Sequence, residues 1–198
     1  MESKNNNRST TFTNWNRKIS CYIFSFLELL AVKTDFFNKL LMRWRKPVFL
    51  NEIELANLSS KDKVLHIGCG IFPSGSIIIA EQTNAKITSI DNNVNAVNIA
   101  RSYVHKNGLS KSIKVEYGDG VDYPVKDFDV IFIAINVWPI DSVLKHLSKN
   151  AKTNTKIICK SVNNDIVNFL ENENLYDTLS VDSILENQHS QSFLLIKK

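Results

Sequence analysis

Cysteine is scarce in this chain of 198 residues, and the three that it has lie far apart, as Cys21, Cys69 and Cys159. No two of them have the Cys-x-x-Cys spacing of many zinc sites, and three scattered thiols cannot form the disulfide framework of a small secreted domain. We therefore expect reduced thiols and a cytoplasmic protein. Three histidines are not spaced with carboxylates or cysteines as metal ligands would be, so we expect surface histidines and no metal site. They are His105, His146 and His189.

Long apolar runs are also absent. The longest candidate, residues 19–32, contains Glu28 and ends at Lys33, well short of the ~20 apolar residues that a membrane span requires. The first 18 residues are too polar for a signal peptide. We expect no transmembrane helix and no secretory signal.

A strong charge of one sign is missing as well, because 24 basic and 20 acidic residues leave a net charge of +4. Residues 1–61 hold 10 basic and 5 acidic residues, whereas residues 62–198 hold 14 and 15. The chain therefore carries no strong nucleic-acid signal. Its N-terminal basic cluster, residues 43–46, is interpreted as a solvated helix end, with contact to a phosphate or an anionic membrane surface as the alternative.

The N-terminal third divides into a tail and a cap. Residues 1–14 have little to bury, which predicts a disordered tail. Residues 15–61 have apolar side chains at helical spacing and predict an N-terminal helical cap.

Within this cap we expect two helices that break near Thr34 and Asp35, either of which can cap the second helix. Pro47 is expected to end the second helix, and a third short helix is expected over residues 48–58.

Residues 62–198 show short runs rich in Val and Ile that alternate with amphipathic stretches. The predicted strands are 63–67, 86–90, 113–117, 129–134, 155–160, 176–183 and 192–197. The predicted helices are 74–82, 94–107, 140–149 and 165–171. Continuous apolar strands indicate an α/β fold with a mostly parallel sheet covered on both faces. The last two strands have only the polar link 186–191 between them, which predicts an antiparallel hairpin.

The strongest functional signal is the segment VLHIGCGIFPSG, residues 64–75, in which a strand leads through a glycine turn into a helix. Gly68 and Gly70 permit a tight turn and a close approach of the backbone to a ligand, and Pro73 suits the start of a helix. Asp91 ends the second strand, where its carboxylate can accept hydrogen bonds from both ribose hydroxyls of a nucleoside.

The expected ligand is a nucleoside without phosphates. Pro73 stands where dinucleotide folds have a third glycine, and no Gly-Lys-Ser/Thr sequence of a P-loop occurs. The segment YGDG closes the third strand, and its Asp119 can accept from an adenine amino group. A turn without a ligand is the alternative for this segment taken alone.

The segments HIGCG, SIDNN and YGDG resemble the first three motifs of the class I S-adenosylmethionine-dependent methyltransferase family over about residues 62–198. The resemblance implies a Rossmann-like, seven-stranded sheet and S-adenosylmethionine as co-substrate. We expect the acceptor to be a small molecule. His66 departs from the family pattern, because the family usually has Asp or Glu there to anchor the methionine amino group. The implied donor-binding residues are His66, Gly68, Cys69, Gly70, Asp91, Asn92, Asp119, Gly120 and Asn136.

Residues 134–139 follow the fourth strand, where this family usually carries the groups nearest the reacting methyl. The segment is not the N/D-P-P-Y/F signature of enzymes that methylate the amino groups of bases or glutamine. Asn136 is a candidate for contact with donor or acceptor. Trp138 is either a pocket wall or, as we favour, a core residue.

A narrower resemblance links GCGIFPSGSIIIA to the nicotianamine synthase-like group, which transfers the aminobutanoyl chain of S-adenosylmethionine and makes opine-type metal chelators. That chemistry needs a carboxylate to accept a proton from an amine. Glu52 and Glu54 are candidate bases, and two solvated helix carboxylates are the favoured alternative. Methyl transfer remains the first expectation, and a non-catalytic binding protein with the same fold is the third.

Overall fold

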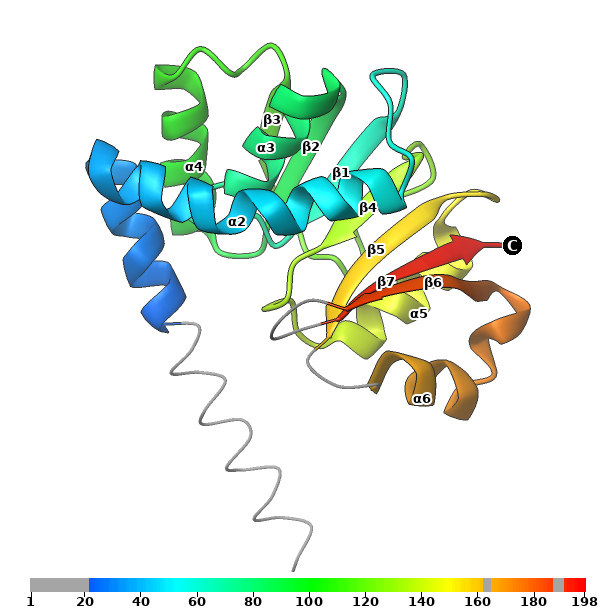
Figure 1. Cartoon of the computed structure of the whole chain (residues 1–198). Coiled ribbons are helices and arrows are strands. Elements are labelled where there is room, and N and C mark those ends of the chain that lie inside the picture. The colour runs from blue at the N-terminus through cyan, green and yellow to red at the C-terminus, as the bar shows by residue number, and fades with distance from the viewer. Residues whose placement is uncertain (1–21, 162–164, 187–190) are drawn as a thin grey trace, which may run out of the picture.

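The computed structural model describes residues 22–161, 165–186 and 191–198. A seven-stranded sheet forms its centre, in the strand order β3-β2-β1-β4-β5-β7-β6 (Figure 1). The strands are β1 (Lys63–Ile67), β2 (Lys86–Asp91), β3 (Ile113–Tyr117), β4 (Val130–Ile133), β5 (Lys156–Ser161), β6 (Leu179–Glu186) and β7 (Gln191–Lys197). The helices are residues 22–33, α2 (Asp35–Leu55), α3 (Ser74–Thr83), α4 (Val94–Lys106), α5 (Ile140–Asn150) and α6 (Asp165–Asn172), with a 3-10 turn η1 (Leu175–Asp177).

The predicted sheet is confirmed. Strands β1 to β5 are parallel, whereas β7 pairs antiparallel with both β5 and β6. Six of the seven strands lie within one residue of their predicted bounds. The exception is β6, which begins at Leu179 instead of 176 because residues 175–177 form η1.

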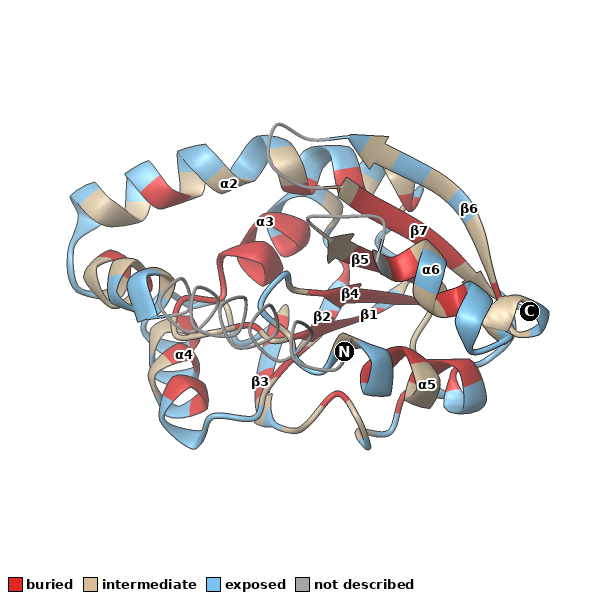
Figure 2. Ribbon diagram, turned by 90° about the horizontal axis from the view of Figure 1, so that it is seen from below, coloured by how far each residue is buried: buried red, intermediate tan, exposed pale blue. Residues whose placement is uncertain are grey.

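Two apolar clusters cover the two faces of the sheet. Helices α3 and α4 pack on one face, and α5 and α6 pack on the other. Alternate residues of β1 explain this division, since Val64 faces the first cluster while Leu65 and Ile67 face the second. The central strands are buried along most of their length in Figure 2, as expected for a parallel sheet between helices.

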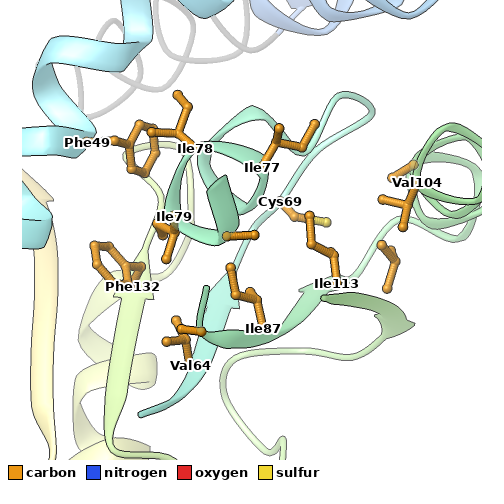
Figure 3. Close-up of a cluster of buried hydrophobic side chains, with 14 of the residues drawn as sticks. Phe49, Val64, Cys69, Ile77, Ile78, Ile79, Ile87, Val104, Ile113 and Phe132 are labelled. Atoms are coloured by element: carbon orange, nitrogen blue, oxygen red, sulfur yellow. The ribbon is translucent and has the colours of Figure 1, made fainter. Parts of the chain in front are cut away.

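The cap lies against α3, outside the sheet. Residues Ser74–Ala80 of α3 are all buried, because the sheet covers one side of this helix and α2 covers another (Figure 2). Figure 3 shows Phe49 of α2 reaching the apolar cluster of Ile78, Ile79 and Phe132. The cap thus belongs to the same core as the sheet.

Two expectations for the cap are wrong, and one is confirmed. The helical break falls at Thr34 as expected, but the Thr34 hydroxyl donates to Leu30 O (3.0 Å) and caps nothing. Pro47 lies inside α2 rather than at its end, so no separate helix spans 48–58. Buried Leu41 precedes the proline and buried Phe49 follows it, and this packing holds the helix through a residue without an N–H.

The predicted tail, residues 1–14, and the cap residues before 22 lie outside the described residues. Within the ranges that the structure describes, none of the helices combines the length and the apolar character needed to cross a bilayer.

Candidate functional site

A cavity of about 1270 Å³ lies where the carboxyl ends of the parallel strands meet the cap. Its walls come from the turns after β1, β2 and β3, from residues 134–138 after β4, from Lys160 of β5, and from the helices of the cap. The cavity therefore brings together the three loops that the sequence predicted to share one rim.

The glycine turn forms the floor of this cavity. Gly68 and Gly70 have φ angles of 80° and 70°, which favour glycine. A Cβ atom on Gly68 would lie 2.5 Å from Val137 Cγ2, and one on Gly70 would lie 2.5 Å from Glu28 Oε2. Cys69 between them is buried, and burial raises the pKa of its thiol, so this thiol is protonated at neutral pH and is no nucleophile.

Asp91 stands at the end of β2, beside the glycine turn. Its Oδ2 accepts from Gly70 N–H (2.9 Å) and its Oδ1 accepts from Asn93 N–H (2.9 Å). These bonds fix the carboxylate in the cavity wall and leave each oxygen with further acceptor capacity. The residue thus fits a ligand with two neighbouring hydroxyl groups.

Asp119 lies in the turn that follows β3 and completes the rim. Asn92 Nδ2 donates to Asp119 Oδ2 (3.1 Å), and Val121 N–H donates to Asp119 Oδ1 (3.2 Å). Gly120 is buried, and a Cβ atom there would lie 2.8 Å from Ile67 Cγ2. Asn92, Asp119 and Gly120 all line the cavity.

His66 is a buried, neutral residue. Its Nδ1 lies 2.7 Å from Ser76 Oγ, which in turn lies 2.7 Å from Ser89 Oγ. Burial, followed by the charges of Lys160 and Arg45, lowers the pKa of His66 to about 3. The side chain therefore brings no negative charge to the cavity.

Residues 134–138 form the wall after β4. Asn136 is exposed and lines the cavity, as its candidate role requires. Trp138 also lines the cavity and is 58% exposed, so the favoured interpretation as a core residue is wrong.

Glu52 and Glu54 do not meet in the cavity. Glu54 lies on the exposed face of α2, as the solvated interpretation expected. Glu52 is fully buried, contrary to that interpretation: its Oε2 pairs with Lys160 Nζ (3.1 Å) and its Oε1 accepts from Ser192 Oγ (2.6 Å). Lys160, not either glutamate, lines the cavity, with Nζ 4.1 Å from the centre of the Phe49 ring.

Sequence reasoning missed two cap residues that line the cavity. Glu28 Oε1 pairs with Arg45 Nη2 (3.0 Å), and Glu28 Oε2 accepts from Ile71 N–H (3.0 Å) in the glycine turn. Arg45 Nη1 donates to Ser74 Oγ (2.7 Å) at the start of α3. The interpretation of residues 43–46 as a solvated helix end is therefore wrong for Arg45. The available signal was the single carboxylate that interrupts the apolar run 19–32.

Metal ligation has no support among the described residues, where no three His, Cys, Asp or Glu side chains are grouped to hold an ion. His105 is exposed, whereas His146 is half-buried and its Nε2 lies 2.8 Å from Tyr123 O. His189 lies outside the described residues.

Solved structures resemble this chain in fold. A mutant of MtNAS in complex with S-adenosylmethionine is 17% identical, with a TM-score of 0.75 over 91% of this chain and 76% of that one. An RNA methyltransferase from Salinibacter ruber in complex with S-adenosyl-L-homocysteine is 15% identical, with a TM-score of 0.63 over 77% and 92%. A SAM-dependent methyltransferase from Aquifex aeolicus is 18% identical, with a TM-score of 0.62 over 76% and 89%.

At the level of sequence, no curated protein matches the chain. A family model described as a methyltransferase domain matches residues 58–193, which include the glycine turn, Asp91 and Asp119. Because that match spans well over half of the chain, the protein belongs to the methyltransferase domain family, within the class I S-adenosylmethionine-dependent superfamily.

Proposed function

We propose that this protein transfers a methyl group from S-adenosylmethionine to a small-molecule acceptor. The observation that carries the proposal is the shared cavity, in which the glycine turn, Asp91 and Asp119 line one rim beneath the cap. The sulfonium of the donor makes its methyl group electrophilic, so the protein has to bind both substrates, orient them and exclude water.

In this proposal each loop binds one part of the donor. Asp91 accepts from the ribose hydroxyls, Asp119 accepts from the adenine amino group, and Gly120 leaves room for the ring. The backbone of residues 68–70 lies beside the methionine part. The fixed Asp91 carboxylate and the positive φ angles of Gly68 and Gly70 support this assignment.

The cap supports a small acceptor. Helix α2 contributes part of the cavity wall, with Trp44 and Phe49 among its lining residues. A volume of about 1270 Å³ exceeds the roughly 300–1,000 Å³ of a pocket for one drug-sized ligand, so donor and acceptor fit together.

Aminobutanoyl transfer is the second candidate. The likeness to MtNAS extends over 91% of this chain, and therefore into the cap, whereas the likeness to the two named methyltransferases covers 76–77%. This candidate stays second because its two suggested bases, Glu52 and Glu54, are absent from the described residues that line the cavity.

The by-product of the reaction tests both candidates. Methyl transfer leaves S-adenosylhomocysteine, whereas aminobutanoyl transfer leaves methylthioadenosine. We expect enzyme-dependent S-adenosylhomocysteine when the protein is incubated with S-adenosylmethionine and pooled cell metabolites and the nucleosides are resolved by mass spectrometry. Methylthioadenosine in its place would favour the second candidate.

Asp91→Ala is the control for this experiment. Loss of the carboxylate should weaken S-adenosylmethionine binding at least tenfold, since a hydrogen bond to a charged group is worth about 1.5–3 kcal/mol. Titration calorimetry measures this loss. A wild-type protein that binds neither S-adenosylmethionine nor S-adenosylhomocysteine would overturn the proposal and favour a non-catalytic protein.

A further inference from the structure

The methionine part of the proposed donor ends in an α-ammonium and an α-carboxylate group, which together form a zwitterion. Binding these groups away from bulk water requires an acidic and a basic side chain next to each other, because a buried charge is costly unless it is paired with an opposite one. His66 cannot supply the acid, since it is neutral and its Nδ1 already faces Ser76 Oγ. The acid has to come from another element.

Glu28 and Arg45 are placed to supply both charges. They lie on different helices of the cap, yet both line the cavity at the glycine turn. Their side chains are 11% and 20% exposed, so the pair is shielded from water but still open to the cavity. Glu28 accepts from Ile71 N–H in the glycine turn, and Arg45 donates to Ser74 Oγ at the start of α3. These two bonds fix the pair beside the glycine turn.

The pair retains capacity for a ligand. Glu28 accepts from Arg45 and from Ile71 N–H, and the backbone of Phe72 also stabilises its charge, whereas a carboxylate offers about four acceptor positions. Arg45 uses two of its five N–H donors, on Glu28 and Ser74. A zwitterion can therefore bind without breaking either anchor, and a neutral pair matches a ligand end that is neutral overall.

The charges also suit this role. Burial raises the pKa of Glu28 even though Arg45 and the backbone N–H groups of Ile71 and Phe72 oppose the shift, so these groups do not fully offset the desolvation of the carboxylate. An arriving ammonium group supplies further compensation.

We propose that Glu28 and Arg45 form a subsite for the amino-acid end of the donor. In it, the Glu28 carboxylate accepts hydrogen bonds from the α-ammonium group, and the Arg45 guanidinium donates to the α-carboxylate. This inference rests on the proposed function, because it assumes that S-adenosylmethionine occupies the cavity.

Three nucleosides separate this role from a merely structural one when their affinities are measured by titration calorimetry. S-adenosylhomocysteine carries both charged groups, decarboxylated S-adenosylmethionine lacks the α-carboxylate, and methylthioadenosine lacks the whole amino-acid end. For Glu28→Gln we expect at least tenfold weaker binding of S-adenosylhomocysteine, with methylthioadenosine within twofold of wild type. For Arg45→Met we expect the same loss for S-adenosylhomocysteine, but a change within twofold for decarboxylated S-adenosylmethionine.

Matched controls come from exposed positions of α2. Glu54→Gln and Lys46→Met remove the same charges outside the cavity and should leave all three affinities unchanged. If a subsite variant fails to fold, as judged by its thermal melting curve, the affinities of the wild-type protein still test whether the amino-acid end contributes to binding. The wild-type protein should bind S-adenosylhomocysteine at least tenfold more tightly than methylthioadenosine.

The outcomes distinguish the two proposals. Equal losses for S-adenosylhomocysteine and methylthioadenosine in Glu28→Gln, or no loss for either, would overturn the subsite alone. A wild-type protein that binds none of the three nucleosides would overturn the proposed function and the subsite with it.

Discussion

His66 illustrates how burial sets the chemistry of a single residue. The imidazole is 4% exposed, lies at the edge of the Phe49 ring and shares hydrogen bonds with Ser76 and Ser89. Lys160 and Arg45 add positive charge nearby, so protonation of the His66 imidazole is disfavoured in the folded protein. The residue therefore acts in the fold as a neutral hydrogen-bonding group.

This burial predicts a pH dependence of stability. The pKa of His66 is about 3 in the folded state and about 6.5 when unfolded, so the unfolded chain binds more protons between these values. The contribution of neutral His66 to the free energy of unfolding is complete above pH 6.5. It is lost as the pH falls toward 3, by up to about 1.4 kcal/mol per pH unit. Urea unfolding at pH 7, 6 and 5 measures this slope.

We expect His66→Asn to flatten the slope, since asparagine does not titrate. His105→Asn, at an exposed position of α4, is the matched control and should keep the wild-type slope. The same pH dependence of the free energy of unfolding in wild type and His66→Asn would contradict the prediction.

At the scale of elements, a buried ion pair fastens the cap to the sheet. Glu52 of α2 pairs with Lys160 of β5 and accepts from Ser192 of β7. Because β7 inserts antiparallel beside β5, one carboxylate contacts two neighbouring strands. The pair thus fixes where the C-terminal half of α2 lies.

Removing one member of the Glu52–Lys160 pair should lower the free energy of unfolding more than replacing both members. Lys160→Met leaves Glu52 without its counter-charge and should lower the free energy of unfolding by about 3–5 kcal/mol. The double variant Lys160→Met with Glu52→Leu should recover most of this loss, because an apolar pair needs no desolvated charge. Urea denaturation of the unliganded protein measures both changes.

A surface pair provides the comparison. Lys145 and Glu173 lie 2.9 Å apart with side chains 44% and 42% exposed, so Lys145→Met should cost less than about 1 kcal/mol. A loss for Lys160→Met as small as that for Lys145→Met would show that the buried pair does not hold the cap.

At the scale of the whole molecule, cap and sheet share one core. Ala31, Leu41 and Phe49 belong to the same apolar cluster as α3 and α4. Figure 1 shows α2 running across α3, whose residues Ser74–Ala80 are all buried. The cap is therefore an integral layer of the domain.

Deleting residues 1–44 should expose this layer. We expect the truncated protein to bind an apolar dye, to lose its cooperative melting transition and to bind no S-adenosylhomocysteine, since Glu28 and the contacts of Leu41 are gone. Deletion of residues 1–14, which lie outside the described residues, is the control and is expected to have no effect. A soluble, cooperatively folding protein without residues 1–44 would contradict an integral cap.

The sequence by itself determined the sheet, most of its helices and the rim of the site. Strand and helix periodicities are local, so β1 and β3 have their predicted bounds, and α3 and α4 begin at the predicted residues. Gly68, Gly70 and Asp91 could be found for the same reason. A glycine turn and a carboxylate at a strand end are recognisable from a few neighbouring residues, and parallel strands bring such ends to one edge.

Only the tertiary structure decided the course of α2 and the two buried ion pairs. Pro47 ends a helix by local rules, but the packing of α2 on both sides of it kept the helix intact. Glu52 meets Ser192 across 140 positions of sequence. A glutamate on a helix has the same local pattern whether it faces water or a distant lysine, and only the partner brought by folding offsets its desolvation.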